Sequence, residues 1–201
     1  MRVTAQYREN RRAEIMATAA RIFAANGFHA TSMADIIGES GLSAGAVYRY
    51  FRSKEELIAS VAETALSSAD ETFEALLAGG AAPSPQETMT AIIRTITERV
   101  APDPVLGVDV TKISVQVWAE ALRSPQLAAR ADDVYRRLRG HFAEVARRWQ
   151  AAGHIHADTE PEQVGAAMLG LVQGFVVQRL LVNGADADDY LAGVKALLSA
   201  R

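Results

Sequence analysis

Cysteine is absent from this 201-residue chain, and lysine is scarce, with 3 lysines against 18 arginines. The lack of cysteine excludes a disulfide scaffold, a thiolate zinc site and a cysteine nucleophile. Long uncharged runs are also missing, since the longest, residues 163–178, is shorter than the roughly 20 residues that a membrane-spanning helix needs. Residues 1–12 are polar and basic, without the apolar stretch of a signal peptide. We therefore expect a cytoplasmic protein with no membrane partner.

Recognisable catalytic motifs are missing as well. No HExxH, GxSxG or P-loop pattern occurs, so we expect neither an enzyme nor a cofactor. The spacing of His154 and His156, with Asp158 close by, suits a shared metal ion. Because these imidazoles follow Gly153, which ends a predicted helix, we interpret them as part of a solvated turn and predict no metal site.

Helix-forming residues are abundant instead. Alanine, the best helix former, occurs 38 times, and 49% of the residues are hydrophobic, which is enough for a buried core. Apolar residues recur at helical spacing along most of the chain. Capping boxes predicted at Ser32 with Asp35, Ser53 with Glu56 and Ser84 with Glu87 mark helix starts. The first predicted helix ends at Asn26, and seven others begin near residues 33, 44, 54, 85, 104, 125 and 161. A last helix carries Tyr190, Leu191, Val194 and Leu197.

Residues 104–121 are ambiguous. Several β-branched residues, among them Val108, Val110 and Ile113, partly alternate with polar ones, which is compatible with a strand. We favour a helix, because no partner strand occurs elsewhere and an isolated strand leaves its backbone groups unpaired. The fold class expected is all-α.

The segment from Met33 to Tyr50 has the size of a helix-turn-helix. Gly41 lies at the turn, and Leu42, Val47 and Phe51 supply the apolar residues that pack the unit onto the first helix. The second helix begins with small residues, Ala44-Gly45-Ala46, and continues with Tyr48-Arg49-Tyr50. Such a helix is able to enter the major groove of DNA with its N-terminal part over the base edges.

The residues from Gly27 to Leu57 resemble the TetR family of transcriptional regulators. The resemblance rests on Gly27-Phe28, Thr31-Ser32, the turn at Gly41-Leu42, and Tyr48-x-Tyr50-Phe51-x-Ser53-Lys54. It implies a dimeric repressor that binds a pseudo-palindromic operator through an N-terminal three-helix domain and releases it on binding a small molecule in a C-terminal helical domain. We accordingly expect a DNA-binding domain over residues 1–53 and a ligand-sensing and dimerisation domain over 54–201.

The resemblance also implies which residues contact DNA. Tyr48 and Lys54 are expected to hold phosphates, and Thr31 and Ser43 to add hydroxyl or backbone contacts at helix starts. Alanine stands at positions 44 and 46, where the family often has lysine and threonine or serine, so more of the base readout is expected from Arg49, with Ala46 against a thymine methyl. The full set of expected DNA contacts is Thr31, Ser32, Ser43, Ala44, Gly45, Ala46, Tyr48, Arg49, Tyr50 and Lys54.

The formal net charge of −3 argues mildly against a DNA-binding protein, but the charge is unevenly distributed. Residues 1–60 hold 8 Lys and Arg against 6 Asp and Glu, a net of +2, whereas residues 61–201 hold 13 against 18, a net of −5. Arg8, Arg11 and Arg12 add to the basic part, where we expect them to reach phosphates or a minor groove.

The remaining helices are expected to bind a largely apolar effector and a second copy of the chain. Pockets are mainly apolar with a few polar groups, and the helix over residues 161–182 is apolar nearly all round, so something must cover it. A monomer core helix, a ligand-independent regulator or activator, and an all-α enzyme or carrier remain alternatives. The expected ligand contacts are Phe73, Met89, Ile92, Gln116, Trp118 and Phe142, and the expected dimer contacts are Gly165, Met168, Leu169, Val172 and Val176.

Overall fold

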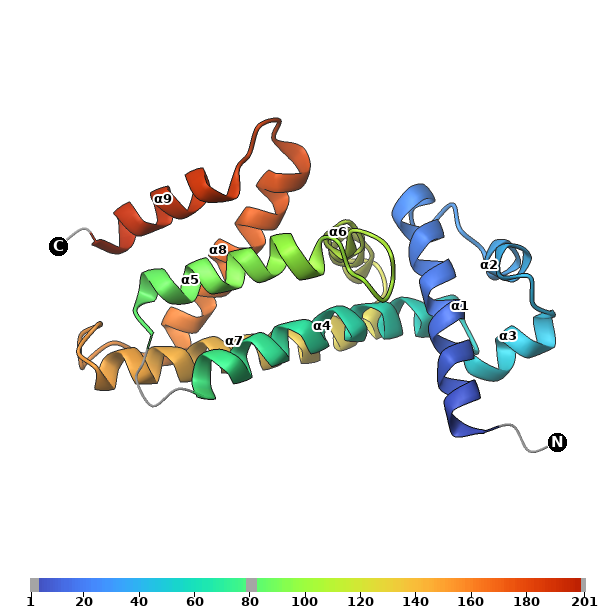
Figure 1. Cartoon of the computed structure of the whole chain (residues 1–201), viewed down its shortest axis with the longest axis horizontal. Helices are drawn as coiled ribbons and strands as arrows, with labels where there is room; N and C mark the ends of the chain where they lie inside the picture. Colours follow the sequence, from blue (N-terminus) through green and yellow to red (C-terminus); the bar gives the residue numbers. More distant parts are fainter. Residues whose placement is uncertain (1–3, 79–82, 200–201) are drawn as a thin grey trace. The chain divides into compact units, whose positions relative to one another are not determined.

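The computed structural model describes residues 4–78 and 83–199, which are helical and contain no strand (Figure 1). The all-α expectation is confirmed. The elements are α1 (Ala5–Asn26), α2 (Met33–Ser40), α3 (Ala44–Tyr50), α4 (Lys54–Ala78), α5 (Pro85–Thr95), the π-helical turn η1 (Ile96–Val100), α6 (Val110–Ala121), α7 (Pro125–Ala151), α8 (Pro161–Leu181) and α9 (Ala187–Ser199).

The ambiguous segment is helical, but only from Val110 onwards, so the expected start at residue 104 is wrong. The buried Asp103 explains the difference, since its Oδ1 accepts hydrogen bonds from the N–H groups of Val105 and Leu106. These hydrogen bonds hold residues 103–106 in a turn. An isolated β-bridge between Asp103 and Val108 closes this turn. Asp109 then caps α6 by accepting from the N–H of Thr111.

The chain packs as two compact units, and neither is one continuous segment. The first consists of the described residues up to Ala65 together with Val100–Ala131, and the second of Leu66–Arg99 and the described residues from Asp132 on. Residues 100–131 belong to the same unit as the N-terminal helices because α6 packs against α1. Helices α4 and α7 each contribute residues to both units.

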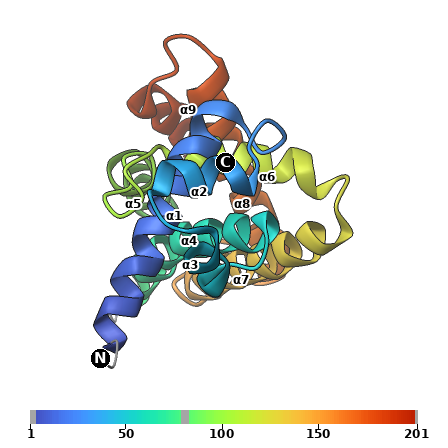
Figure 2. The same cartoon turned by 90° about the vertical axis from the view of Figure 1, so that its right-hand side faces the viewer.

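The core of the first unit joins α1, α2, α3, the start of α4 and α6; in Figure 2 the helices α1 to α3 face the viewer. Phe23 and Phe28 meet edge to face with ring centroids 5.0 Å apart, beside the Gly27 that ends α1. The fully buried members include Ile15, Phe23, Ile36, Val47, Phe51 and Leu57, and Ile113 of α6 is 1% exposed.

In the second unit, α9 packs against both α5 and α8. The Tyr190 hydroxyl of α9 donates to the carbonyl of Leu171 in α8 at 2.6 Å. Helix α8 crosses α7 at Gly165, where a Cβ would lie 2.9 Å from the N of Ala143 and from the O of Arg139. Glycine is required there because two helix backbones approach too closely for a side chain.

Candidate nucleic-acid interface

Helices α2 and α3 are joined by the short turn at residues 41–43, and two residues set its geometry. Gly41 ends α2 at φ 65°, a left-handed conformation that L side chains rarely adopt. Ser43 begins α3, since its hydroxyl accepts a hydrogen bond from the N–H of Ala46. Val47 and Phe51, both fully buried, then anchor α3 in the core. The turn and the anchors together determine which face of α3 points outward.

The outward face of α3 carries the residues expected to read DNA. Ala44, Gly45, Tyr48 and Arg49 are exposed, and Tyr48 shows 46% of its surface. Positions 44, 45, 48 and 49 share one side of a helix, opposite Val47. Ala46 and Tyr50 flank this face and are half-buried.

The start of α2 is fastened by a capping box. The Ser32 hydroxyl accepts from the N–H of Asp35, and the Asp35 carboxylate accepts from the N–H of Ser32 at 2.7 Å. Hydrogen bonds from the Ser32 N–H and hydroxyl favour the ionised carboxylate and lower the pKa of Asp35. The Ser32 hydroxyl, which was expected to contact DNA, thus already forms hydrogen bonds within the protein.

Lys54, at the start of α4, holds the loop between α1 and α2. Its Nζ donates to the carbonyl oxygens of Phe28 at 2.8 Å and Thr31 at 3.1 Å. An ammonium has three donors, so one N–H remains for a phosphate. Thr31 is only 1% exposed, and its hydroxyl donates to the carbonyl of Gly27. Its side chain therefore stabilises the loop and is not presented to a ligand.

Two arginines of α1 also make contacts within the protein. The Arg12 guanidinium lies 4.8 Å from the centre of the Phe51 ring and donates to the hydroxyl of Ser60 at 2.8 Å. Arg12 thereby holds the end of α3 against α1 and α4. Arg11 donates to the Tyr7 hydroxyl and pairs with Glu14; the Tyr7 hydrogen bond, and then the Glu14 charge, raise the pKa of Arg11.

Helix α6 is connected to α1 and the loop after it by two polar contacts that the sequence did not indicate. Gln116 Nε2 donates to the carbonyl of Phe23 at 3.1 Å, and His29 Nε2 lies 2.8 Å from a carboxylate oxygen of Glu120. Gln116 was expected to contact a ligand together with Trp118, which also lies on α6. In the structure its Nε2 connects α6 to the end of α1.

The other expected ligand contacts lie in the second unit and are all buried. Phe73 of α4 meets Phe142 of α7 edge to face, with ring centroids 4.8 Å apart, and stacks on His141. Met89 and Ile92 lie on α5 and are 1% and 6% exposed. The structure thus brings Phe73 and Phe142 together as packed core residues.

Most of the expected dimer contacts face the interior of the second unit. Gly165, Met168, Leu169 and Val176 are buried, and Val172 is half-buried. The exposed apolar side chains lie elsewhere on α8, α9 and the loop between them: Leu181 at 73%, Val182 at 54%, Leu197 at 72% and Leu198 at 41%.

Helix α8 has a further property of note. Its 21 residues are long and apolar enough to cross a bilayer, and 28% of the apolar stretch is buried. Core helices of soluble proteins meet the same two conditions, so this is weak support for a membrane span.

The residues after α7 agree with a solvated turn. His156 Nδ1 lies 3.5 Å from the Asp158 carboxylate, and both side chains are largely exposed. Gly153 adopts φ 76°, as expected for the residue that ends a helix. Within the described residues, no group of three side chains is placed to hold a metal ion.

Comparison with known proteins decides the family. Residues 15–61 match the bacterial regulatory proteins of the tetR family, and residues 85–201 match the C-terminal region of the BetI-type transcriptional repressors. The chain belongs to the TetR family of transcriptional regulators. Membership in this family makes it a DNA-binding regulator and not an enzyme.

Individual TetR-family proteins resemble the chain to different extents. The transcriptional regulator UidR of Escherichia coli (strain K12) is 26% identical over 93% of this chain and 90% of its own length. YfiR of Bacillus subtilis (strain 168) is 33% identical, but the alignment spans about half of either protein, 50% and 51%.

Two solved structures share the fold. Salmonella enterica GusR has a TM-score of 0.78 at 24% identity, over 98% of this chain and 96% of its own. A transcriptional regulator from Saccharomonospora viridis in complex with choline has a TM-score of 0.76 at 22% identity, over 96% and 97%.

Proposed function

We propose that the protein is a cytoplasmic, dimeric repressor that binds a pseudo-palindromic operator through α3 and leaves it when a small molecule binds. The observation that carries the proposal is the outward face of α3, where Tyr48 and Arg49 are exposed while Val47 is fully buried. A helix held in this way is able to enter the major groove, and two-fold symmetry places half-sites about 34–36 Å apart.

Each residue at the interface has a proposed role. Arg49 donates to a guanine edge, and Ala46 contacts a thymine methyl. Tyr48 and the third N–H of Lys54 bind phosphates. The remaining contacts come from Ser32, Ser43, Ala44, Gly45 and Tyr50; the buried hydroxyl of Thr31 is left out.

The proposed dimer forms through the exposed apolar surface of α8 and α9. Leu181 and Leu197 are each more than 70% exposed, and an apolar surface of this kind is usually covered by a partner. Sedimentation velocity tests this assignment. Leu197→Arg should shift the protein towards monomer, whereas Leu122→Arg on the first unit, where Leu122 is 89% exposed, should leave the dimer intact.

Release by a ligand requires that the ligand bind one of two states of the protein more tightly. Helices α4 and α7 contribute residues to both units, so the chain itself connects the second unit to the DNA-binding helices. Within the first unit, Gln116 of α6 is hydrogen-bonded to the end of α1. A structural neighbour that binds choline supports a small-molecule response.

Fluorescence anisotropy with labelled DNA from the region upstream of the gene tests the whole proposal. We expect binding that weakens as salt rises and that at least one added small molecule, choline among those tried, abolishes. Binding that no molecule reverses would instead favour the alternative of a ligand-independent regulator or activator.

A further inference from the structure

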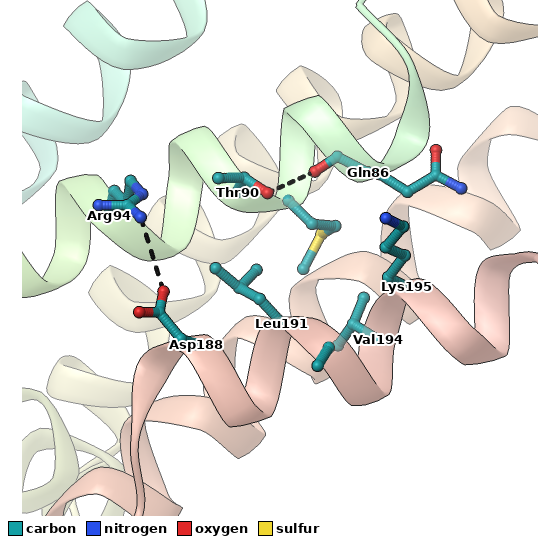
Figure 3. A pocket seen from close by; sticks show the side chains of 9 residues that line it. Gln86, Thr90, Arg94, Asp188, Leu191, Val194 and Lys195 are labelled. Atoms are coloured by element: carbon teal, nitrogen blue, oxygen red, sulfur yellow. Dashed lines mark hydrogen bonds and ion pairs between the residues drawn. The ribbon is translucent and has the colours of Figure 1, made fainter.

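A cavity of about 260 Å³ lies between α5 and α9 (Figure 3). It belongs entirely to the second unit and shares only Met89 with the ligand contacts expected from the sequence. The two helices run antiparallel along it, since Arg94 near the end of α5 meets Asp188 near the start of α9.

The two ends of this cavity differ in charge. At one end, Arg94 lies 3.5 Å from Asp188 and 3.6 Å from Glu98, so its charge is compensated. At the other end, Figure 3 shows the Lys195 ammonium beside the Gln86 side chain. Within residues 4–78 and 83–199, Lys195 forms neither a hydrogen bond nor an ion pair.

The carboxylates on the same two helices are engaged with partners other than Lys195. Asp188 precedes it by seven residues, about 10.5 Å along a helix, and is paired with Arg94. Glu87 follows Gln86 on α5, but its carboxylate is used in the capping box, where it accepts from the N–H of Ser84 at 2.7 Å. Lys195 therefore forms an ion pair with neither of these carboxylates.

The wall between the two ends is apolar. Met89 is 1% exposed and Val194 is 4% exposed, and Leu191 of α9 also lines the cavity. A cavity with an apolar wall and one cation that has no ion-pair partner matches a molecule with an apolar tail and a single negative charge.

We propose that the cavity between α5 and α9 binds a monoanionic amphiphile, a carboxylate with a short acyl or aromatic tail. The carboxylate lies at Lys195 and the Gln86 amide, and the tail lies on Met89 and Leu191. This site is separate from the DNA interface, and the proposal concerns binding to the free protein only. It therefore stands or fails whatever the outcome of the DNA experiments.

Isothermal titration calorimetry of the full chain with sodium octanoate tests the proposal, with octan-1-ol as the uncharged molecule of equal length. Octanoate should bind the wild type more tightly than octan-1-ol. Lys195→Gln should weaken octanoate binding by about fivefold, which is what the loss of one partly exposed ion pair costs. Lys195→Arg keeps the charge and should keep the affinity.

Control variants separate a built site from general adsorption. Lys112→Gln on α6, which removes a different exposed lysine, should leave octanoate binding unchanged. Leu191→Ala should weaken both octanoate and octan-1-ol, because it shortens the apolar wall. Equal octanoate affinities for wild type and Lys195→Gln would overturn the proposal. The proposal would also fail if Lys195→Gln changed dimerisation but left octanoate affinity unchanged, because the cavity would then be a contact between protein copies.

Discussion

Replacement of Lys54 by methionine should affect both the stability of the DNA-binding helices and the salt dependence of operator binding. Methionine keeps an unbranched apolar side chain but removes the ammonium. In the structure that ammonium donates to the carbonyls of Phe28 and Thr31 at 2.8 and 3.1 Å. Both carbonyls belong to the loop that leads into the helix-turn-helix.

The size of the stability effect follows from these two contacts. A hydrogen bond to a charged group contributes about 1.5–3 kcal/mol when it is well shielded. The Lys54 contacts are only partly buried, so water replaces part of what is lost. We expect Lys54→Met to lower the free energy of unfolding by about 2 kcal/mol for the two bonds together.

The size of the DNA effect follows from charge alone. Each phosphate that a protein neutralises contributes about 0.9 to the slope of log K against log salt. The proposed dimer presents two Lys54 side chains, so the variant should reduce that slope by about 2. Binding should weaken to all DNA sequences alike, since phosphate contacts carry no base information.

Urea unfolding followed by circular dichroism measures the first effect, and fluorescence anisotropy over a series of salt concentrations measures the second. Lys112→Met is the matched control, because Lys112 is exposed on α6 and should affect neither quantity. An unchanged salt slope in Lys54→Met would refute the phosphate contact. An unchanged unfolding free energy would show that the two carbonyl contacts contribute nothing measurable.

Three other changes are expected to have distinct effects. Arg49→Ala should relax base preference at one operator position by about 1–3 kcal/mol without changing stability; selection from random DNA would show this, and an unaltered preferred sequence would contradict it. Asp35→Asn should destabilise the protein at pH 7. The pKa of Asp35 is lowered in the folded protein, so its carboxylate contributes to the free energy of unfolding above about pH 4. This contribution is lost as the pH falls through the folded-state pKa. The difference in melting temperature from wild type should therefore shrink in acid, and a constant difference would be inconsistent with the capping role. Gly165→Ala should lower the free energy of unfolding by about 1–2 kcal/mol, since the added methyl meets backbone atoms at 2.9 Å. Gly140→Ala on α7 adds a methyl with no neighbour within 4 Å, and it should raise the free energy of unfolding by about 1 kcal/mol. Equal effects of the two alanines in urea unfolding would mean that α7 and α8 do not approach closely at Gly165.

Two helix starts were predicted correctly, because a capping box depends on residues only three positions apart. The capping boxes at Ser32 with Asp35 and at Ser84 with Glu87 are confirmed. The third box, expected at Ser53, is only half formed: Glu56 donates its N–H to the Ser53 hydroxyl, but its carboxylate accepts from the N–H of Arg52. Even in a local motif, the carboxylate can therefore accept from the N–H of a neighbouring residue rather than from the expected one.

Contacts between distant residues were not predictable. Gln116 and Phe23 are 93 positions apart, and nothing in either segment indicates that they meet. Thr31 illustrates the same limit at the site itself. Its place in the family motif suggested a DNA contact, whereas in the structure its hydroxyl is buried against the carbonyl of Gly27.

The sequence by itself determined the family, the helical class and the helix-turn-helix, because all three follow from local spacing, capping and a specific motif. The tertiary structure alone decided which face of α8 is buried. Helix α8 is apolar on all sides, so its sequence carries no periodic signal that distinguishes Gly165, packed on α7, from the exposed Leu181. In such a helix, burial is a property of the neighbours that pack against it, and those neighbours come from segments far away in the chain.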